Sequence, residues 1–195
     1  AETLLNSSPA LSINGNVKTK VQNLELSKSQ FLGNMFQYFR NAISNSKPAK
    51  EYLEKRNLDN SILEIGYNSG QFHHGERKTE ELLKQALETG LLLDKGLINS
   101  RTGEKGFSPF GKWCICFALR NQKNEVTGLY FRSVLNDDKA KHYYLKNRSG
   151  IYPGYPKPET KKLILTEAII DGASLLQIES IKKDYEIENI KKAIE

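Results

Sequence analysis

Two acidic residues near the C-terminal end have the types and the spacing that can do chemistry. Glu167 follows the short apolar run 163–165 and Thr166, and Asp171 lies four residues further on, at the predicted start of a helix. An acid at the carboxyl end of a buried strand stands where open α/β sheets place functional groups, and the helix dipole favours an acid in the first turn. Such a pair can hold a hard divalent ion or act as a base. Alternatively, Asp171 is an ordinary first-turn residue and Glu167 pairs with a lysine.

A second candidate site is the stretch from Lys112 to Lys157. It holds nine basic and three acidic residues, an excess of six that equals the net charge of the whole chain of 195 residues. Basic groups neutralise phosphates and aromatic faces accept unpaired bases, so this composition suits single-stranded nucleic acid. In a second interpretation, which stays open, the aromatic residues form the core of a β-meander and the lysines line a solvated face. The aromatic residues are Trp113, Phe117, Tyr130, Phe131, Tyr143, Tyr144, Tyr152 and Tyr155.

The first part of the chain is predicted to be helical. Residues 1–26 are polar without a sustained period and are interpreted as an arm, whereas the apolar residues from Phe31 to Ile43 fall on one helix face. Ser46 is the predicted N-cap of a second helix that ends near Asn57, and Pro48 is tolerated in its first turn. A third helix is predicted to begin at Thr79 and to end at Gly90.

The period changes to two after Gly111, which indicates strands. Residues 113–120 and 125–134 are predicted strands joined by a turn at 121–124, with a third strand over 141–146 and a proline-rich loop over 152–158. Residues 162–167 are a predicted buried strand, 170–181 are helical in period, and 186–195 form a charged helical tail. The predicted fold class is therefore α+β, with a helical N-terminal half, an antiparallel hairpin sheet and a closing βα unit.

The cysteines and histidines are weaker candidates. Cys114 and Cys116 could be combined with His73, His74 or His142 into a zinc site, but alternation in a strand places both sulfurs on one face, where they are interpreted as small apolar side chains under a sheet. The histidines are interpreted as surface groups. The segment Gly103–Gly106 is interpreted as a turn, because it lacks the full phosphate-loop pattern.

Composition bounds the class of protein. Hydrophobic residues make up 38% and charged residues 27% of the chain, as in a globular protein with a core, and no stretch approaches the ~18 apolar residues of a membrane span. Neither a signal peptide nor a disulfide framework is visible, which favours a reducing, cytoplasmic setting and no membrane partner.

The segment Leu163–Asp171, LILTEAIID, resembles the first motif of the TOPRIM fold, a hydrophobic strand followed by a Glu and, four residues on, an Asp. The preceding segments are similar to the catalytic core of bacterial DnaG-type DNA primases, in the same order. They are Ala49–Leu58 for the "A-x-x-Y-L-x-x-R-G-L" helix, Ile65–Tyr67 for the "I-G-Y" turn, Leu82–Leu92 for the following helix, Cys116–Arg120 with Val126–Arg132 for the hairpin, and Tyr143–Asn147 for a drifted "K-Y-L-N-S". The resemblance covers roughly residues 48–180.

This resemblance implies a basic N-terminal subdomain over residues 48–160, joined to a partial TOPRIM subdomain over 161–195, with residues 1–47 as an arm and helix of unknown role. It implies that single-stranded DNA template and ribonucleotides bind in the cleft between the subdomains, with Mg²⁺ or Mn²⁺ as cofactor in the complete protein. Glu167 would be the metal-associated or general-base glutamate, with Asp171 in support. The residues that would contact template or nucleotide are Arg120, Arg132, Lys141, Lys146 and Arg148. A replicative helicase is a further implied partner, through regions that this chain does not contain.

The departures from the family concern the metal sites. No D-x-D pair occurs in the sequence, and neither does the cysteine and histidine spacing of the family's zinc ribbon. The resemblance therefore describes a primase core cut within its TOPRIM subdomain. It predicts little primer synthesis by this chain alone. The leading hypothesis is the template-binding part of a primase, an RNA-primer-synthesising nucleotidyltransferase. The alternatives are a non-catalytic nucleic-acid-binding module of a phage or mobile element and a TOPRIM nuclease.

Overall fold

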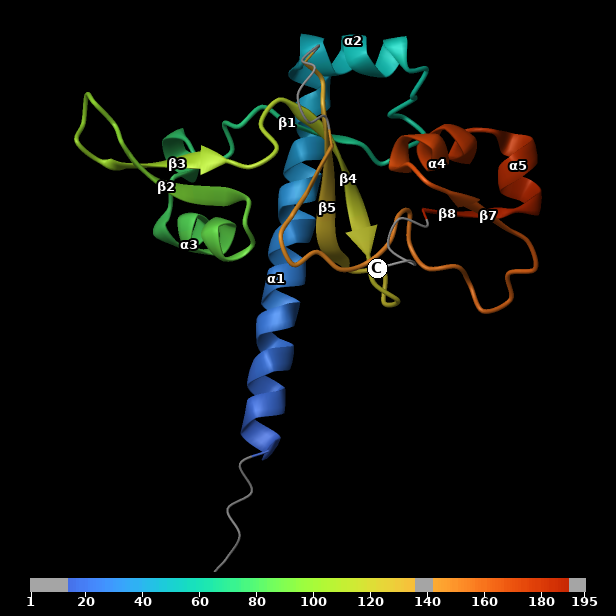
Figure 1. The fold of residues 1–195 in the computed structure, drawn as a ribbon, viewed down its shortest axis with the longest axis horizontal. Coiled ribbons are helices and arrows are strands. Elements are labelled where there is room, and N and C mark those ends of the chain that lie inside the picture. Colours follow the sequence, from blue (N-terminus) through green and yellow to red (C-terminus); the bar gives the residue numbers. More distant parts are fainter. Residues whose placement is uncertain (1–13, 136–141, 190–195) are drawn as a thin grey trace, which may run out of the picture.

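The structure is a computed structural model that describes residues 14–135 and 142–189. It is an α+β protein, as predicted, in which a central sheet is flanked by a smaller hairpin on one side and a βαβ unit on the other (Figure 1). The helices are α1 (Asn14–Ala42), α2 (Lys47–Lys55), α3 (Glu80–Glu88), α4 (Ile169–Leu176) and α5 (Glu179–Asp184), with short 3₁₀ turns at Ile43–Asn45 and Gly75–Arg77. The strands are β1 (Gly66–Asn68), β2 (Leu92–Ile98), β3 (Lys105–Pro109), β4 (Cys114–Arg120), β5 (Val126–Ser133), β6 (His142–Tyr144), β7 (Leu163–Thr166) and β8 (Glu186–Asn189).

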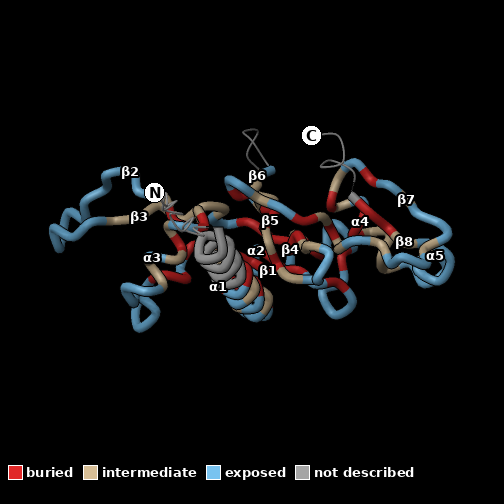
Figure 2. Tube along the Cα trace, turned by 90° about the horizontal axis from the view of Figure 1, so that it is seen from below, coloured by how far each residue is buried: buried red, intermediate tan, exposed pale blue. Residues whose placement is uncertain are grey.

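The central sheet has the order β1-β4-β5-β6, and all of its neighbours are antiparallel. Both of its faces are covered, so β4 is buried along almost its whole length (Figure 2). One face carries Cys114, Cys116 and Ala118, which pack in one core with residues of α1. The other face carries Ile115, Phe117 and Leu119, which pack in a second core with residues of α2 and α4. Alternation along one strand therefore supplies two cores at once.

The predicted helix ends are confirmed where a side chain or a glycine defines them. The Ser46 hydroxyl accepts a hydrogen bond from the Ala49 amide at 3.3 Å, and the Thr79 hydroxyl accepts one from Leu82 at 3.2 Å, so both residues are N-caps. Gly90 follows α3 with a φ of +78°, the left-handed conformation that closes a helix without a Cβ penalty.

The predicted arm over residues 1–26 is wrong from Asn14 onward, because α1 begins there and runs to Ala42 as one helix. Segment 14–26 mixes good helix formers such as lysine and leucine with asparagine, valine, threonine and glycine, so neither propensity nor a sustained period marks it as helix. The N-terminal part of α1 extends beyond the other elements of the molecule (Figure 1).

The β2–β3 hairpin and strand β1 were not predicted as strands. Leu91 and Leu92 are buried in the core with α3, but the distal half of β2 is exposed and carries a mixture of polar and apolar residues, so no alternation marks it (Figure 2). An ion pair between Lys105 and Asp94, 2.6 Å between the charged atoms, joins the two strands there. Within the predicted turn Gly103–Gly106, Lys105 already belongs to β3.

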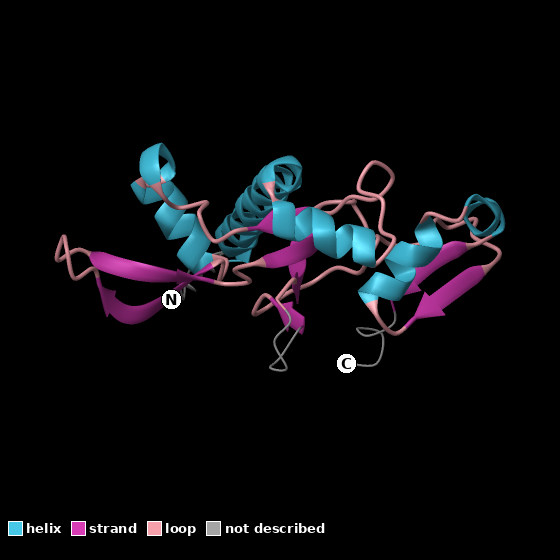
Figure 3. Cartoon of the chain, turned by 90° about the horizontal axis from the view of Figure 1, so that it is seen from above, coloured by secondary structure: helices cyan, strands magenta, loops and turns pink. Residues whose placement is uncertain are grey.

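The C-terminal region is a βαβ unit in which β7 and β8 are paired in parallel and are connected by α4 and α5 (Figure 3). The predicted helix over 170–181 is two helices, and the predicted helical tail is wrong for residues 186–189, which form β8. Residues 186–189 form a strand because α4 and α5 bring them back beside β7, which supplies their hydrogen-bond partners. The prediction of a buried β7 is also wrong, since Leu163 and Leu165 are 41% and 57% exposed. Residues 190–195 of the predicted tail lie outside the described residues.

Helix α4 joins this unit to the central sheet. Ile169 and Ala173 are buried in the core that contains Phe117. At the end of α4, the Gln177 side chain accepts a hydrogen bond from the Asp59 amide at 2.7 Å and donates one to the Asn57 carbonyl at 2.8 Å. The βαβ unit is thus held to the rest of the molecule by the apolar contacts of α4 and by Gln177, whose side-chain amide both accepts and donates a hydrogen bond.

Candidate nucleic-acid interface

Arg132 lies on β5, at the edge of the central sheet that β6 completes. Its Nε atom donates a hydrogen bond to the Tyr52 hydroxyl of α2 at 3.2 Å, and its Nη1 atom contacts Nε2 of His142, its partner across the β5–β6 pair. The predicted phosphate-facing arginine is therefore held between a helix and a strand. A guanidinium positioned in this way keeps its remaining donors in a fixed fork, which suits a phosphate oxygen pair.

His142 connects this arginine to a buried tyrosine. Its Nδ1 atom lies 2.6 Å from the Tyr130 hydroxyl. Because a guanidinium can only donate, the Nε2 atom of His142 must accept, and the Nδ1 atom then carries the proton and donates to Tyr130. Burial raises the pKa of Tyr130, so its hydroxyl stays neutral in this contact. His142 is exposed, as its interpretation as a surface group predicts, and its two ring nitrogens contact Tyr130 and Arg132.

Two further arginines lie over tyrosine rings on the same side of the molecule. The Arg148 guanidinium is 4.1 Å from the centroid of the Tyr144 ring, and this ring is 5.0 Å from that of Tyr130. On α2, the Arg56 guanidinium is 5.8 Å from the Tyr52 ring. In cation–π contacts of this kind, the ring face attracts the cation by roughly 0.5–1 kcal/mol at exposed sites. We call the whole set the arginine–tyrosine cluster, and it consists of Tyr52, Arg56, Tyr130, Arg132, His142, Tyr144 and Arg148.

A cavity of about 280 Å³ opens beside Arg132, between α2 and the end of β5. Basic side chains outnumber acidic ones in its wall, and Glu51, its acidic residue, is 3.6 Å from the Lys47 ammonium. The cavity therefore favours an anion. Its lining residues are Pro48, Glu51, Tyr52, Lys55, Arg56, Arg132, Ser133, Val134 and Leu135.

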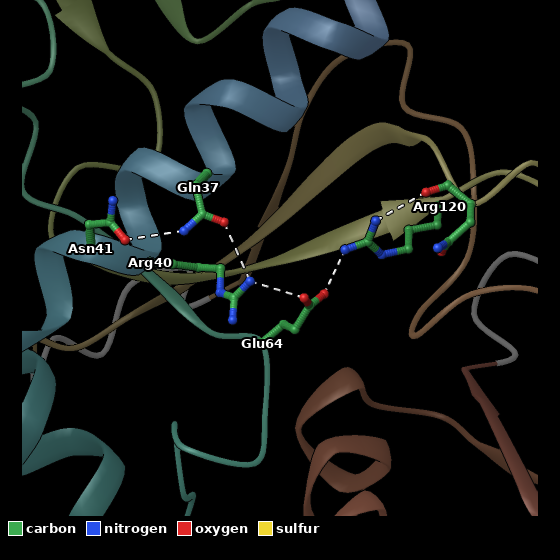
Figure 4. Close-up of polar contacts among 6 residues, drawn as sticks. Gln37, Arg40, Asn41, Glu64 and Arg120 are labelled. Atoms are coloured by element: carbon green, nitrogen blue, oxygen red, sulfur yellow. Dashed lines mark hydrogen bonds and ion pairs between the residues drawn. The ribbon is translucent and has the colours of Figure 1, made fainter.

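Arg120, another predicted binding residue, has a different setting. Its Nη2 atom donates to Glu64 at 2.6 Å, and Nη1 donates to the Asn124 carbonyl at 3.1 Å. The same carboxylate accepts from Arg40 of α1 at 3.0 Å, so Glu64 bridges two arginines (Figure 4). Gln37 and Asn41 extend the network along α1. Glu64 balances part of the charge of Arg120, which ties β4 to the loop before β1 and to α1.

The remaining predicted residues are more scattered. Lys146 is exposed just after β6, close in the chain to Arg148. Lys141 lies outside the described residues. Glu167 and Asp171 are both exposed, after the end of β7 and in the first turn of α4. The structure therefore gathers Arg132 and Arg148 into one cluster, whereas the two acids belong to the βαβ unit.

The described residues do not fit a complete metal centre. Among them, no group of three or more His, Cys, Asp and Glu side chains is arranged to hold an ion. Glu167 and Asp171 could supply one or two carboxylates to Mg²⁺, but no third protein ligand joins them in the described ranges.

The aromatic residues divide between the two interpretations of the basic stretch. Phe117, Tyr130, Phe131 and Tyr152 are buried and form core, as the β-meander interpretation predicts. Trp113 and Tyr155 are exposed, and Tyr143 and Tyr144 are half-buried. Sequence reasoning missed Tyr52 and Arg56 as site residues, although their spacing of four places them on one helix face.

Cys114 and Cys116 are buried thiols on one face of β4, which confirms their interpretation as core residues. Burial raises the pKa of Cys114 to about 12. His73 was predicted at the surface but is buried beside Phe72, with ring centroids 5.2 Å apart. Burial, followed by the charges of His74 and Lys78, lowers its pKa to about 4. In the described part of the chain, no helix has the length and apolar character needed to cross a bilayer.

Comparison with known proteins adds a family and a fold. Residues 19–152 match the DNA primase catalytic core, N-terminal domain family. The match begins inside α1, so the family model includes most of this helix. The comparison with curated proteins found no match.

Solved primase structures share the fold at low sequence identity. A DnaG primase catalytic domain bound to ssDNA is 15% identical, with a TM-score of 0.60 over 84% of this chain and 55% of that one. A DNA primase domain from Pseudomonas aeruginosa is 20% identical, with a TM-score of 0.59 over 83% of this chain and 53% of that one. The Aquifex aeolicus primase, with its zinc-binding and RNA polymerase domains, is 16% identical, with a TM-score of 0.59 over 83% of this chain and 41% of that one. This chain therefore spans about half the length of these structures.

Proposed function

The chain belongs to the DNA primase catalytic core, N-terminal domain family, and from this premise we propose that it binds single-stranded DNA template along the arginine–tyrosine cluster. The proposal assigns template binding to residues 48–160. In the proposal, residues 161–195 are a partial TOPRIM subdomain, and this subdomain contains the acid pair Glu167 and Asp171.

The observation that carries the proposal is the setting of Arg132. Its guanidinium is held by Tyr52 and His142 beside a cavity in which basic side chains predominate. Arg148, over the Tyr144 ring, continues the positive charge along the β6 side of the sheet. Positive charge along an aromatic-lined path is the combination that binds a single strand without regard to its sequence. A DnaG catalytic domain bound to ssDNA has the same fold, which supports the proposal.

Ribonucleotide binding and primer synthesis would involve the acids of the βαβ unit. We propose that Glu167 and Asp171 face the incoming nucleotide from that unit, while Arg132 and Lys146 bind template phosphates. Template binding is then independent of the acids. Glu167→Gln should leave the affinity for single strands unchanged, with or without Mg²⁺, and a Mg²⁺-dependent loss of template binding in this variant would contradict that division.

The test of template binding is fluorescence anisotropy with a labelled strand of ~20 nucleotides at low salt. Arg132→Glu should weaken binding about tenfold or more, because a hydrogen bond between charged groups contributes ~1.5–3 kcal/mol. Lys84→Glu is the matched control, since it reverses an exposed charge on α3 and should change the affinity less than about twofold. Equal effects of the two variants, or no binding by the unmodified chain, would overturn the proposal.

A further inference from the structure

The connection between β3 and β4 presents an exposed tryptophan in an unusual backbone conformation. Trp113 is 45% exposed and has a φ of +56°. The left-handed region is uncommon for a bulky side chain and costs roughly 1–2 kcal/mol. Two main-chain hydrogen bonds hold it there, from the Trp113 amide to the Asn68 carbonyl at 2.7 Å and from the Val134 amide to the Trp113 carbonyl at 3.0 Å.

The neighbouring lysine is fixed against the same ring. The Lys112 ammonium lies 4.3 Å from the centroid of the Trp113 ring. The lysine stem crosses Gly70, where a Cβ atom would come within 2.6 Å of Lys112 Cγ, so the close approach requires a glycine. Lys112 and Trp113 thus form an ordered surface pair, in which an ammonium covers one part of the ring.

This pair borders the proposed interface. Val134, whose amide is bonded to the Trp113 carbonyl, lines the cavity beside Arg132. In the register of the central sheet, Arg132 is paired with Ile115, two residues after Trp113. Arg132 on β5 and Val134 just after it therefore place the arginine and the backbone of the tryptophan close together.

We propose that the Trp113 ring is a stacking site for one unpaired base of the bound single strand, with the Lys112 ammonium beside the phosphate of that nucleotide. This inference rests on the proposed function. An indole ring offers a large apolar face that stacks on any base, and a nearby cation neutralises the backbone that the base brings with it. A base paired in a duplex is stacked on both sides and cannot use the site.

Trp113 is the single tryptophan of the chain, so its own fluorescence reports contact with a base. The experiment titrates the full chain with a single strand of ~20 thymidines and with an abasic strand of the same length, which has the phosphates without the bases. The thymidine strand should bind and quench Trp113, whereas the abasic strand should bind, as measured by competition in anisotropy, without quenching. Binding of the thymidine strand without a change in fluorescence would overturn the stacking site and leave the proposed function intact. If neither strand binds, both proposals fail.

Variants provide a second measurement that does not depend on the reporter. Trp113→Leu should weaken binding of the thymidine strand about fivefold or more, since stacking contributes that much or more per base. Trp113→Phe keeps a flat ring at the same backbone position and should recover most of the affinity. Tyr155→Ala is the matched control, because Tyr155 is 44% exposed but lines a different cavity, with Lys123. Equal losses for Trp113→Leu and Tyr155→Ala would contradict the inference.

Discussion

The two sheets of this protein differ in how much of their surface is covered. The central sheet has α1 on one face and α2 with α4 on the other, and the side chains of β4 are buried on both sides. The sheet of β7 and β8 has two strands, with Ile187 packed toward α4, while Leu163 and Leu165 are exposed. The arginine–tyrosine cluster borders the covered sheet, and the two acids belong to the βαβ unit that contains the partly covered one.

This difference distinguishes the proposed binding surface, which belongs to the central sheet, from the acid pair, which belongs to the smaller βαβ unit. Arg132 and Tyr130 lie on β5, which is paired with β4 on one side and β6 on the other, so the packing of the sheet fixes the positions of both residues. Glu167 is exposed just after β7, which has a single paired neighbour among the described residues, and Asp171 is exposed in the first turn of α4. We expect the central sheet to dominate stability, and the βαβ unit to open at lower cost.

The largest expected effect is a core truncation in the central sheet. Phe117 is fully buried, and its ring centroid lies 5.3 Å from that of Tyr152. Phe117→Ala should lower the free energy of unfolding by about 3–5 kcal/mol, whereas Leu165→Ala in β7 should lower it by less than about 1 kcal/mol. Urea denaturation followed by circular dichroism measures both. Similar losses would show that the two sheets contribute equally and would break the comparison.

The two regions should also respond to pH in opposite directions. The pKa of His73, which is buried beside Phe72, is lowered from 6.5 to about 4, mainly by burial, so its stabilising neutral form is present above pH 6.5 and is lost as the pH falls toward 4. The pKa of Glu188 in β8 is raised to about 8, first by burial and then by Glu186, so its contribution is complete below pH 4.5 and is lost as the pH rises through 8.

Each variant should therefore flatten one limb of the stability profile. His73→Leu should reduce the loss between pH 6.5 and 4, and Glu188→Gln should reduce the loss between pH 4.5 and 8, each by roughly 1–2 kcal/mol after allowance for solvent screening. Melting temperature measured across this range gives the result. A variant that shifts the whole profile without changing its shape would show that its side chain does not titrate in this range.

A smaller effect is expected at the joint between the regions. Gln177→Ala removes two hydrogen bonds to the backbone at Asn57 and Asp59 and should cost about 1 kcal/mol. Hydrogen exchange should then quicken in the βαβ unit, while β4 and β5 stay protected. Gln71→Ala, at an exposed position before Phe72, is the control. Equal acceleration in both sheets would mean that they unfold as one cooperative unit.

Local signals made part of this fold predictable from the sequence. Ser46, Thr79 and Gly90 define helix ends through short-range bonds, and the turn at 121–124 between two strands of period two fixes the hairpin. The start of α1 and strand β8 could not be predicted, because residues 14–26 show no sustained period and β8, a strand of four residues, takes its structure from its partner β7. These elements depend on tertiary contacts.

The site was predicted in part for a similar reason. Charge and aromatic content identified the stretch that contains Arg132 and Arg148, but composition cannot separate a core tyrosine from an exposed one. Arg120, like Arg132, follows an apolar residue near the end of a predicted strand, yet it pairs with Glu64, which lies 56 residues away in the chain. Tyr52 and His142 join the cluster through contacts with Arg132 that only the folded sheet creates.

The most direct test of the central claim is the salt dependence of single-strand binding. The basic residues at the cluster and its borders are Lys55, Arg56, Arg132, Lys146 and Arg148, and four such contacts at roughly 0.7 released ions each predict a log–log slope of about −3. Reversing the charge of Arg132 and Lys146 together should flatten the slope by about 1.4. A slope near zero for the unmodified chain, or an unchanged slope in the double variant, would contradict the assignment of template binding to this cluster.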